Sequence, residues 1–208
     1  MELKHISFPG ENITYVTPTW NNLNQLAFLI AKDIFHANDT SKKIDRIVTL
    51  AKGGWPMTRS LVDFLQVGKV ASLGVSFYKG INERFKKPHI YQDLPVSVVG
   101  ETVLLFDDVA DTGESLKFVK KHLEKLGVKE VITATLFYKP HSTVKPDFYG
   151  TETTAWIIFP YDAVEAIYMF KDKWAEQGLS VTEIKKRFVQ LGAQEEWLEL
   201  YIDQSPLV

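Results

Sequence analysis

Two hydrophobic periodicities alternate along this chain, one typical of buried strands and the other of amphipathic helices. Short, nearly continuous apolar runs predict strands that are covered on both faces. Apolar residues repeated at three- and four-residue steps predict helices that bury one face. The pattern predicts strands at residues 13–16, 46–51, 70–77, 103–106 and 130–137, and helices at residues 20–37, 114–126, 163–176, 180–191 and 195–201, with a further helix beginning near Pro56.

Most of the candidate chemistry lies in the stretch Val103–Leu116. Its apolar run ends in the adjacent carboxylates Asp107 and Asp108, and Asp111 and a Thr-Gly step precede the next helical pattern. This order predicts a strand, a tight loop and a helix, and ligands of open α/β sheets bind at the carboxyl ends of strands. A loop of small residues that opens a helix suits a phosphate, whereas the carboxylates suit sugar hydroxyls or Mg²⁺.

A second glycine-containing loop, Lys52-Gly53-Gly54, follows the predicted strand at residues 46–51. Two glycines let the backbone approach a ligand closely, and the lysine supplies a positive charge for a phosphate. Alone this loop is a weak signal, but beside the acidic stretch it supports a phosphate-containing ligand.

Composition narrows the possible chemistry further. The 208 residues carry a formal net charge of −2 and no cysteine. The charge gives no electrostatic reason to expect nucleic acid or a membrane as a partner, and the lack of cysteine excludes disulfides, zinc–thiolate sites and thiol nucleophiles. The first residues contain no apolar signal core and no run reaches the length of a membrane span, so we expect a cytoplasmic protein.

Residues 103–116 resemble the 5-phosphoribosyl-1-pyrophosphate (PRPP) signature of the type I phosphoribosyltransferases. In that family an apolar strand is followed by two acidic residues, two small or apolar residues, Asp-Thr-Gly, and a Ser or Thr, and every position is filled here. Phosphoacceptor receiver domains share an Asp pair after a strand but do not require the later Asp-Thr-Gly. A solvated turn needs no three carboxylates within five residues.

The resemblance covers residues 46–162 and is greatest to the 6-oxopurine phosphoribosyltransferases. It implies an α/β fold, a mainly parallel sheet flanked by helices on both faces, with a small hood and a helical C-terminal extension. The expected phosphoribosyltransferase domain is 1–162, its hood loop 78–97 closes over PRPP, and the extension is 163–208. Many purine members begin the hood with Ser-Tyr, whereas this chain has Ser76-Phe77-Tyr78, which leaves open the group that touches pyrophosphate from that side.

The resemblance assigns PRPP to the two loops and the acidic pair. The lysine–glycine loop would hold the leaving pyrophosphate, and the family's frequent non-proline cis peptide would fall at Ala51–Lys52. Asp107 and Asp108 would bind the ribose hydroxyls and would reach Mg²⁺ through water or those hydroxyls. The amides of residues 110–115 would clamp the 5′-phosphate. The residues assigned to PRPP are Lys52, Gly53, Gly54, Asp107, Asp108, Val109, Ala110, Asp111, Thr112, Gly113, Glu114 and Ser115.

The resemblance assigns the purine base to residues further along the chain. Asp111 stands where purine members place a general base near N7. Lys139 stands where 6-oxopurine members bind the exocyclic oxygen, and Trp156 and Ile157 stand where an aromatic ring and the next backbone group meet the base. Asp162 matches a loosely defined position near the metal. Without the resemblance, an exposed charge at Lys139 and a core position for Trp156 are the competing interpretations.

These assignments imply an enzyme that transfers the phosphoribosyl group of PRPP to hypoxanthine, guanine or xanthine in purine salvage, with Mg²⁺ as cofactor. We expect a homo-oligomer, a dimer or a tetramer, with no nucleic acid or membrane partner. The alternative is a PRPP- or nucleotide-sensing regulator with the same fold and no turnover. The presence of Asp111 and Lys139 favours the enzyme.

Overall fold

The computed structural model describes residues 3–37, 43–78 and 87–202. Contacts group the chain into two units, residues 23–154 and residues 1–22 with 155–208. Among the described residues, none of the helices combines the length and apolar character that a segment crossing a bilayer needs.

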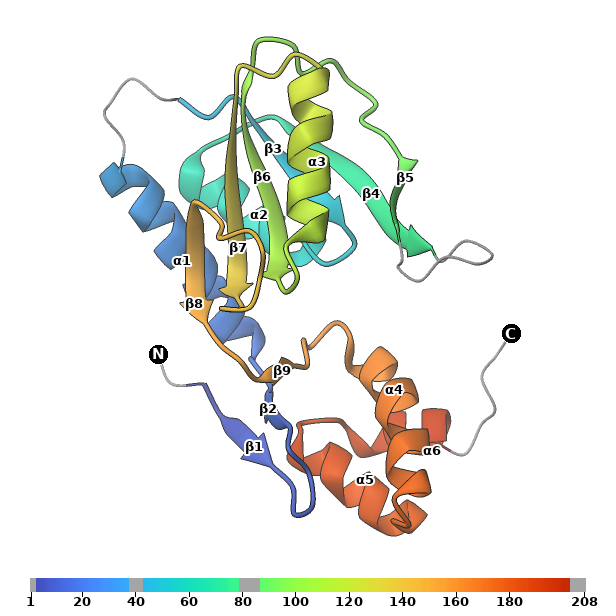
Figure 1. Cartoon of the computed structure of the whole chain (residues 1–208). Coiled ribbons are helices and arrows are strands. Elements are labelled where there is room, and N and C mark those ends of the chain that lie inside the picture. The colour runs from blue at the N-terminus through green and yellow to red at the C-terminus, as the bar shows by residue number, and fades with distance from the viewer. Residues whose placement is uncertain (1–2, 38–42, 79–86, 203–208) are drawn as a thin grey trace. The chain divides into compact units, whose positions relative to one another are not determined.

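The unit of residues 23–154 is built on a six-stranded sheet in the order β5-β4-β3-β6-β7-β8 (Figure 1). Neighbouring strands are parallel except β4 and β5, which are antiparallel. The strands are β3 (Arg46–Ala51), β4 (Val70–Tyr78), β5 (Lys87–Gln92), β6 (Thr102–Ala110), β7 (Glu130–Tyr138) and β8 (Phe148–Glu152).

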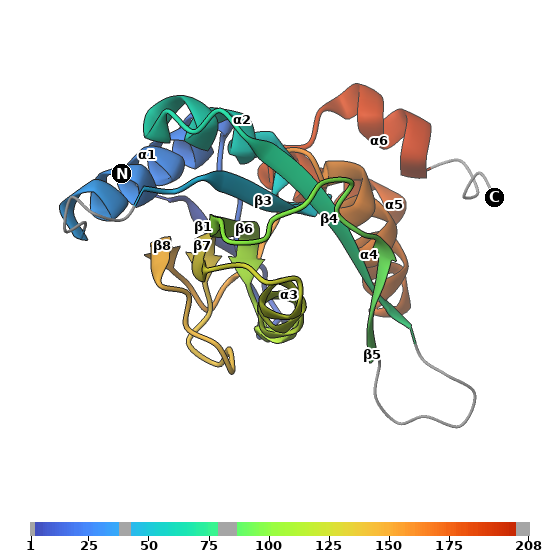
Figure 2. The ribbon, with the colours of Figure 1, turned by 90° about the horizontal axis from the view of Figure 1, so that it is seen from above.

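Helices cover both faces of this sheet. Seen from above, α1 (Trp20–Ala37) and α2 (Trp55–Leu65) lie on one face and α3 (Glu114–Lys125) on the other (Figure 2). Leu116, Val119 and Leu123 of α3 pack on Val103 and Leu105 of β6, and all five are buried. Each such side chain contributes roughly 1.5–3 kcal/mol when removed from water. The expected α/β architecture, with a mainly parallel sheet between two helical layers, is confirmed.

Two edge strands contradict the sequence-based prediction. Residues 78–97 were expected to form a loop, but β5 pairs antiparallel with β4 within that segment. The sequence pattern predicts no strand within residues 141–153, but β8 pairs with β7 there. Edge strands are exposed on one side and carry charged residues and proline, as in Lys87-Pro88, so their hydrophobic pattern is weak. The remainder of the expected hood loop, residues 79–86, lies outside the described residues.

The other unit combines a small sheet in the order β1-β2-β9 with three helices. Its core is aromatic, with Phe8, Tyr15, Phe170, Trp174 and Phe188 all buried. The three helices predicted for the C-terminal extension, hereafter the tail, are confirmed. The elements are β1 (His5–Ser7), β2 (Thr14–Val16), β9 (Trp156–Ile157), α4 (Ala163–Glu176), α5 (Val181–Gln190) and α6 (Glu195–Ile202).

A buried carboxylate, Glu11, ties the tail to the N-terminal segment within this unit. It accepts hydrogen bonds from the Tyr15 hydroxyl at 2.6 Å, from Arg187 Nη1 at 2.9 Å and from the Trp174 indole. Burial, with the neighbouring Glu11 carboxylate as a second cause, raises the pKa of Tyr15 well above its usual value. Contacts group the tail with the N-terminal segment and divide the chain near residue 154, and the domain boundary at residue 162 stays a prediction.

Trp20 is the first residue of the predicted helix at residues 20–37, and its exposure differs from what the apolar pattern of that helix predicts. The helical stripe predicts a core position, yet 53% of this side chain is exposed and its ring lies 5.8 Å from that of Tyr161. The predicted start of the helix is confirmed, because Thr19 Oγ1 accepts a hydrogen bond from the Asn22 amide at 3.1 Å. As the first residue of α1, Trp20 precedes the buried positions that begin at Leu23.

Candidate active site

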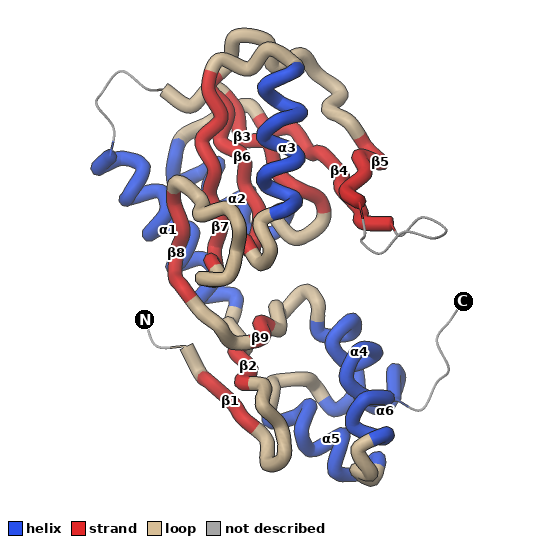
Figure 3. Tube along the Cα trace, in the orientation of Figure 1, coloured by secondary structure: helices blue, strands red, loops and turns tan. Residues whose placement is uncertain are grey.

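Three loops that carry predicted site residues leave the same edge of the six-stranded sheet. They follow β3, β6 and β7, which are parallel, so their carboxyl ends share one edge, as the loops in Figure 3 show. The candidate site in this unit is built from these loops, and its residues come from three distant parts of the sequence.

The loop after β3 packs directly against β6. A Cβ on Gly53 would lie 2.6 Å from Asp108 Cγ, and one on Gly54 would lie 2.5 Å from Thr49 Oγ1 and 2.9 Å from the Phe106 carbonyl. A side chain at Gly54 would meet backbone that cannot give way, whereas one at Gly53 would force the Asp108 carboxylate to move. The expected cis peptide between Ala51 and Lys52 is confirmed. The side chain of Lys52 is exposed, and its amine is available to an anion.

The acidic pair belongs to the end of β6, which is longer than predicted and continues to Ala110. Asp107 Oδ1 accepts a hydrogen bond from the Asp108 amide at 3.0 Å. Burial raises the pKa of Asp107 well above its usual value, and the adjacent Asp108 carboxylate adds to this effect. Two carboxylates in one place favour a cation or a set of hydroxyl donors beside them.

The chemistry of these carboxylates fits Mg²⁺ when a substrate supplies further ligands. Within the described ranges no three His, Cys, Asp or Glu side chains are grouped to hold a metal ion. Mg²⁺, however, is commonly bound by one or two carboxylates together with substrate phosphate oxygens and water. Asp107 and Asp108 match the protein's share of such a site.

The loop after β6 opens α3 through Gly113, which has a φ of +80°. A Cβ there would also lie 2.6 Å from Ser142 Oγ and 2.8 Å from the Val144 amide nitrogen. The carbonyl of Thr112 accepts hydrogen bonds from the Thr143 amide at 3.0 Å and from its hydroxyl at 2.8 Å. The loop is thus fixed against the β7–β8 connection, and the first amides of α3 form a suitable site for a phosphate.

Lys139, at the end of β7, meets Asp111 of the neighbouring loop. Lys139 Nζ lies 3.5 Å from Asp111 Oδ1, and the Lys139 amide donates to the Ala110 carbonyl at 3.1 Å. Only 8% of Lys139 is exposed, so the competing interpretation of an exposed charge is wrong. A buried cation beside a half-exposed carboxylate offers one donor and one acceptor to the same ligand.

His141 is a member of this cluster that the sequence did not reveal. Its Nε2 lies 2.9 Å from the same Asp111 Oδ1. A histidine two residues after Lys139 follows no general motif, and the contact depends on how the β7–β8 connection turns. The contacts of Ser142 and Thr143 with the phosphate-loop candidate depend on the same turn and could not be predicted either.

The remaining predicted site residues, Trp156, Ile157 and Asp162, belong to the other unit and are described within it, and their assignment to the base and the metal stays a prediction. Trp156 in β9 is 39% exposed, and its ring lies edge-on to Phe170 at 5.6 Å. Ile157 is partly buried and pairs with Val16. Asp162 precedes α4, and its carbonyl accepts the Ala166 amide at 2.9 Å. Trp156 therefore has exposed ring surface and is not a fully buried core residue.

Comparisons of the sequence and of the structure with known proteins identify the same family. The model of the phosphoribosyl transferase domain family matches residues 19–166. The xanthine-guanine phosphoribosyltransferase of Gluconobacter oxydans is 26% identical over 154 residues, which cover 73% of this chain and 87% of that protein. The hypoxanthine-guanine phosphoribosyltransferase of Lactococcus lactis is 28% identical over 108 residues, 50% of this chain and 58% of that protein.

A solved structure extends this similarity. The purine phosphoribosyltransferase from Pyrococcus horikoshii superposes with a TM-score of 0.63 at 32% identity, over 71% of this chain and 93% of that chain. The match to the Lactococcus protein covers less than two thirds of that protein's length, whereas the Gluconobacter and Pyrococcus proteins are covered almost completely. The family match spans both glycine loops, the acidic pair and Lys139, and the chain therefore belongs to the phosphoribosyl transferase domain family.

Proposed function

We propose that this protein transfers the 5-phosphoribosyl group of PRPP to hypoxanthine, guanine or xanthine, releasing pyrophosphate. The observation that carries the proposal is the Lys139–Asp111 pair, 3.5 Å apart at the carboxyl edge of the sheet. A 6-oxopurine presents its carbonyl oxygen and its N7 side by side. A buried cation can donate to the former, and a carboxylate can accept a proton from the latter. The names of relatives as xanthine-guanine and hypoxanthine-guanine enzymes support the same substrate class.

PRPP takes the remainder of the carboxyl edge in this proposal. The amides that open α3 after Gly113 bind the 5′-phosphate. Asp107 and Asp108 bind the ribose hydroxyls, because carboxylate oxygens accept hydrogen bonds from hydroxyl groups. Lys52 and the backbone of the β3–α2 loop bind the pyrophosphate. Asp107 and Asp108 would also hold Mg²⁺ together with PRPP oxygens, and the ion would supply Lewis-acid neutralisation of the leaving group.

The reaction breaks the C1–O bond to pyrophosphate while a purine nitrogen forms a bond to C1. Positive charge grows on the ribose ring, and the carboxylates of Asp107 and Asp108 stabilise it by their proximity. Asp111 takes the proton that the base loses. Lys139 stabilises the negative charge that develops on the carbonyl oxygen of the base as that proton leaves.

Pyrophosphate release is the direct test of this proposal. The protein is incubated with PRPP, Mg²⁺ and each of hypoxanthine, guanine, xanthine, adenine, orotate and uracil, and pyrophosphate is measured over time. We expect release with at least one 6-oxopurine and none with adenine or the pyrimidines. PRPP binding by calorimetry without release with any base would instead support the regulator and would overturn the enzyme.

A further inference from the structure

The two cationic or donor side chains that contact Asp111 both approach one of its two oxygens. His141 Nε2 lies 2.9 Å from Oδ1, and Lys139 Nζ lies 3.5 Å from the same atom. Both contacts are thus made to Oδ1, and Oδ2 is the second acceptor atom of the same carboxylate.

Of these two contacts, the one with His141 has the geometry of a hydrogen bond. The Lys139 distance is beyond the usual range for an N–H···O bond, whereas 2.9 Å lies at its most common value. A carboxylate oxygen accepts, so His141 Nε2 carries the donated proton. This fixes the direction of the bond: the imidazole donates and Asp111 Oδ1 accepts.

The backbone brings both residues to the same carboxylate. The Lys139 amide donates to the Ala110 carbonyl at 3.1 Å, and the Ser142 amide donates to the Lys139 carbonyl at 2.9 Å, which closes a tight turn around His141. Asp111 itself has 51% of its side chain exposed. A half-exposed carboxylate at the start of a loop needs a restraint if it is to accept a proton in one fixed geometry.

We propose that His141 is a positioning residue that holds Asp111 by Oδ1 so that Oδ2 accepts the proton of the purine base. The proposal rests on the proposed function and adds a residue to it. His141 touches Asp111 and not the reacting atoms, so it acts through Asp111. Its loss lowers the fraction of enzyme in which the carboxylate is correctly oriented, and this affects turnover more than the binding of PRPP.

The test compares His141→Leu with His141→Gln. Leucine removes the donor, whereas glutamine carries an amide N–H at the same number of bonds from Cα as Nε2 and can donate to Oδ1. We expect kcat to fall by about 10-fold or more in His141→Leu and to stay within about threefold in His141→Gln, with KM for PRPP within about twofold in both. Such a split between kcat and KM is characteristic of an interaction used in the transition state.

A double-mutant cycle separates positioning from a general structural role. In an Asp111→Asn background, His141→Leu is expected to change kcat by less than about twofold, because the group that it positions is already lost. His36→Leu, an exposed histidine in the last turn of α1, is the matched control and leaves kcat unchanged. Thermal melts of each variant check folding, and His141, with 59% of its side chain exposed, tolerates replacement.

Several results overturn the proposal. These are an unchanged kcat in His141→Leu, an equal loss in His141→Leu and His141→Gln, or an undiminished effect of His141→Leu in the Asp111→Asn background. Absence of pyrophosphate release by the unmodified protein with every base refutes the proposed function, and the role of His141 falls with it. Normal release by the unmodified protein with any of the first three results refutes the role of His141 alone.

Discussion

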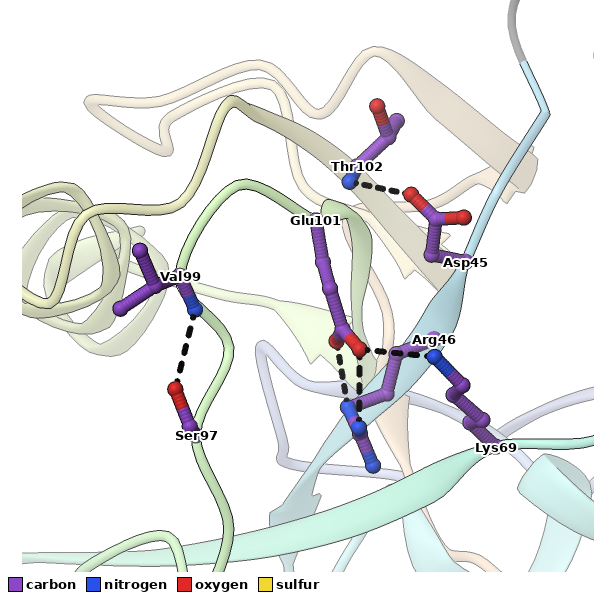
Figure 4. A network of polar contacts seen from close by, with 7 residues as sticks. All are labelled: Asp45, Arg46, Lys69, Ser97, Val99, Glu101 and Thr102. Carbon is purple, nitrogen blue, oxygen red and sulfur yellow. Dashed lines mark hydrogen bonds and ion pairs between the residues drawn. The ribbon is translucent and has the colours of Figure 1, made fainter.

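Charged side chains are arranged differently at the two ends of the parallel strands in the six-stranded sheet. We call the end where these strands begin the amino edge and the end where they finish the carboxyl edge. At the amino edge, Arg46 donates to Glu101 through two nitrogens, at 2.7 and 3.0 Å, and Lys69 donates to the same carboxylate at 3.0 Å (Figure 4). Asp45 accepts the Thr102 amide at 2.8 Å beside them. The hydrogen bond from Arg46 is the main cause that lowers the pKa of Glu101 below its usual value.

At the carboxyl edge, by contrast, two like charges are adjacent in the sequence. Asp107 and Asp108 follow each other at the end of β6, and burial raises the pKa of Asp107. Adjacent buried carboxylates cost folding free energy unless donors or cations lie beside them. The amino edge of these strands carries an ion-pair network, whereas the carboxyl edge carries the residues that we propose bind ligands, so variants at the two edges are expected to affect different measurements.

The largest effect is expected from Asp111→Asn at the carboxyl edge. Loss of a general base lowers kcat by about 10²–10⁴, with PRPP affinity within a few fold. The free energy of unfolding changes by less than about 0.5 kcal/mol, because the side chain is half exposed. Steady-state kinetics, PRPP titration and urea unfolding measure the three quantities.

The exposed carboxylate Asp33 in α1 provides a matched control for this variant. Asp33→Asn is expected to leave both kcat and unfolding unchanged. Unchanged turnover in Asp111→Asn would assign Asp111 to the phosphate loop or to the structure.

Arg46→Ala at the amino edge is expected to lower stability and to leave catalysis nearly unchanged. The variant leaves Glu101, whose side chain is 15% exposed, without its main partner. Breaking a nearly buried ion pair costs about 3 kcal/mol of unfolding free energy, whereas kcat and KM stay within about twofold at temperatures where the variant is folded. Lys69→Ala, which removes a partner that is 59% exposed, costs less than about 1 kcal/mol. Equal destabilisation by both variants would contradict this account of the amino edge.

Gly53→Ala tests the role of Asp108 at the carboxyl edge. The added Cβ would lie 2.6 Å from Asp108 Cγ, so it displaces the carboxylate that we assign to the ribose. Overpacking costs about 1–3 kcal/mol, which corresponds to about a 5- to 150-fold loss if it falls on PRPP binding. Gly68→Ala is the control, because nothing lies within 4 Å of its added Cβ. An unchanged PRPP affinity in Gly53→Ala would remove Asp108 from the ribose site.

The smallest effect is a pH dependence at the amino edge. Because the pKa of Glu101 is lower in the folded state, the pair contributes stability in full above the unfolded value, about 4.3, and loses it as pH falls through the folded pKa. The difference in unfolding free energy between the unmodified protein and Glu101→Gln is therefore expected to be constant above about pH 5 and to shrink below pH 4. A difference that grows on acidification would contradict the assignment.

The sequence predicts the central strands and helices of this fold well because their buried faces carry strong patterns. Residues 46–51 match β3 at both ends, and residues 163–176 match α4. The edge strands β5 and β8 were missed because an edge position tolerates charged residues and proline. Trp20 was predicted to be buried because a periodic pattern does not show where the first turn of a helix leaves the core.

Candidate site residues could be predicted where they form a continuous motif in the sequence. They were missed where their position depends on tertiary contacts. The acidic pair, the glycine loops and Lys139 stand next to recognisable strand ends, and the structure brings them to one edge of the sheet. His141 has no motif, and its distance to Asp111 follows from the turn after Lys139.

The central claim is that Lys139 selects a purine that carries a carbonyl oxygen at C6. The most direct measurement is kcat/KM for hypoxanthine, guanine, xanthine and adenine, on the unmodified protein and on Lys139→Ala. Lysine can donate to a carbonyl but faces a second donor, the amino group, in adenine, and a buried unpaired group costs about 1–3 kcal/mol. We predict use of at least one 6-oxopurine, no use of adenine, and a loss of at least about tenfold for 6-oxopurines in Lys139→Ala, equivalent to about 1.4 kcal/mol. Efficient use of adenine by the unmodified protein would contradict the claim.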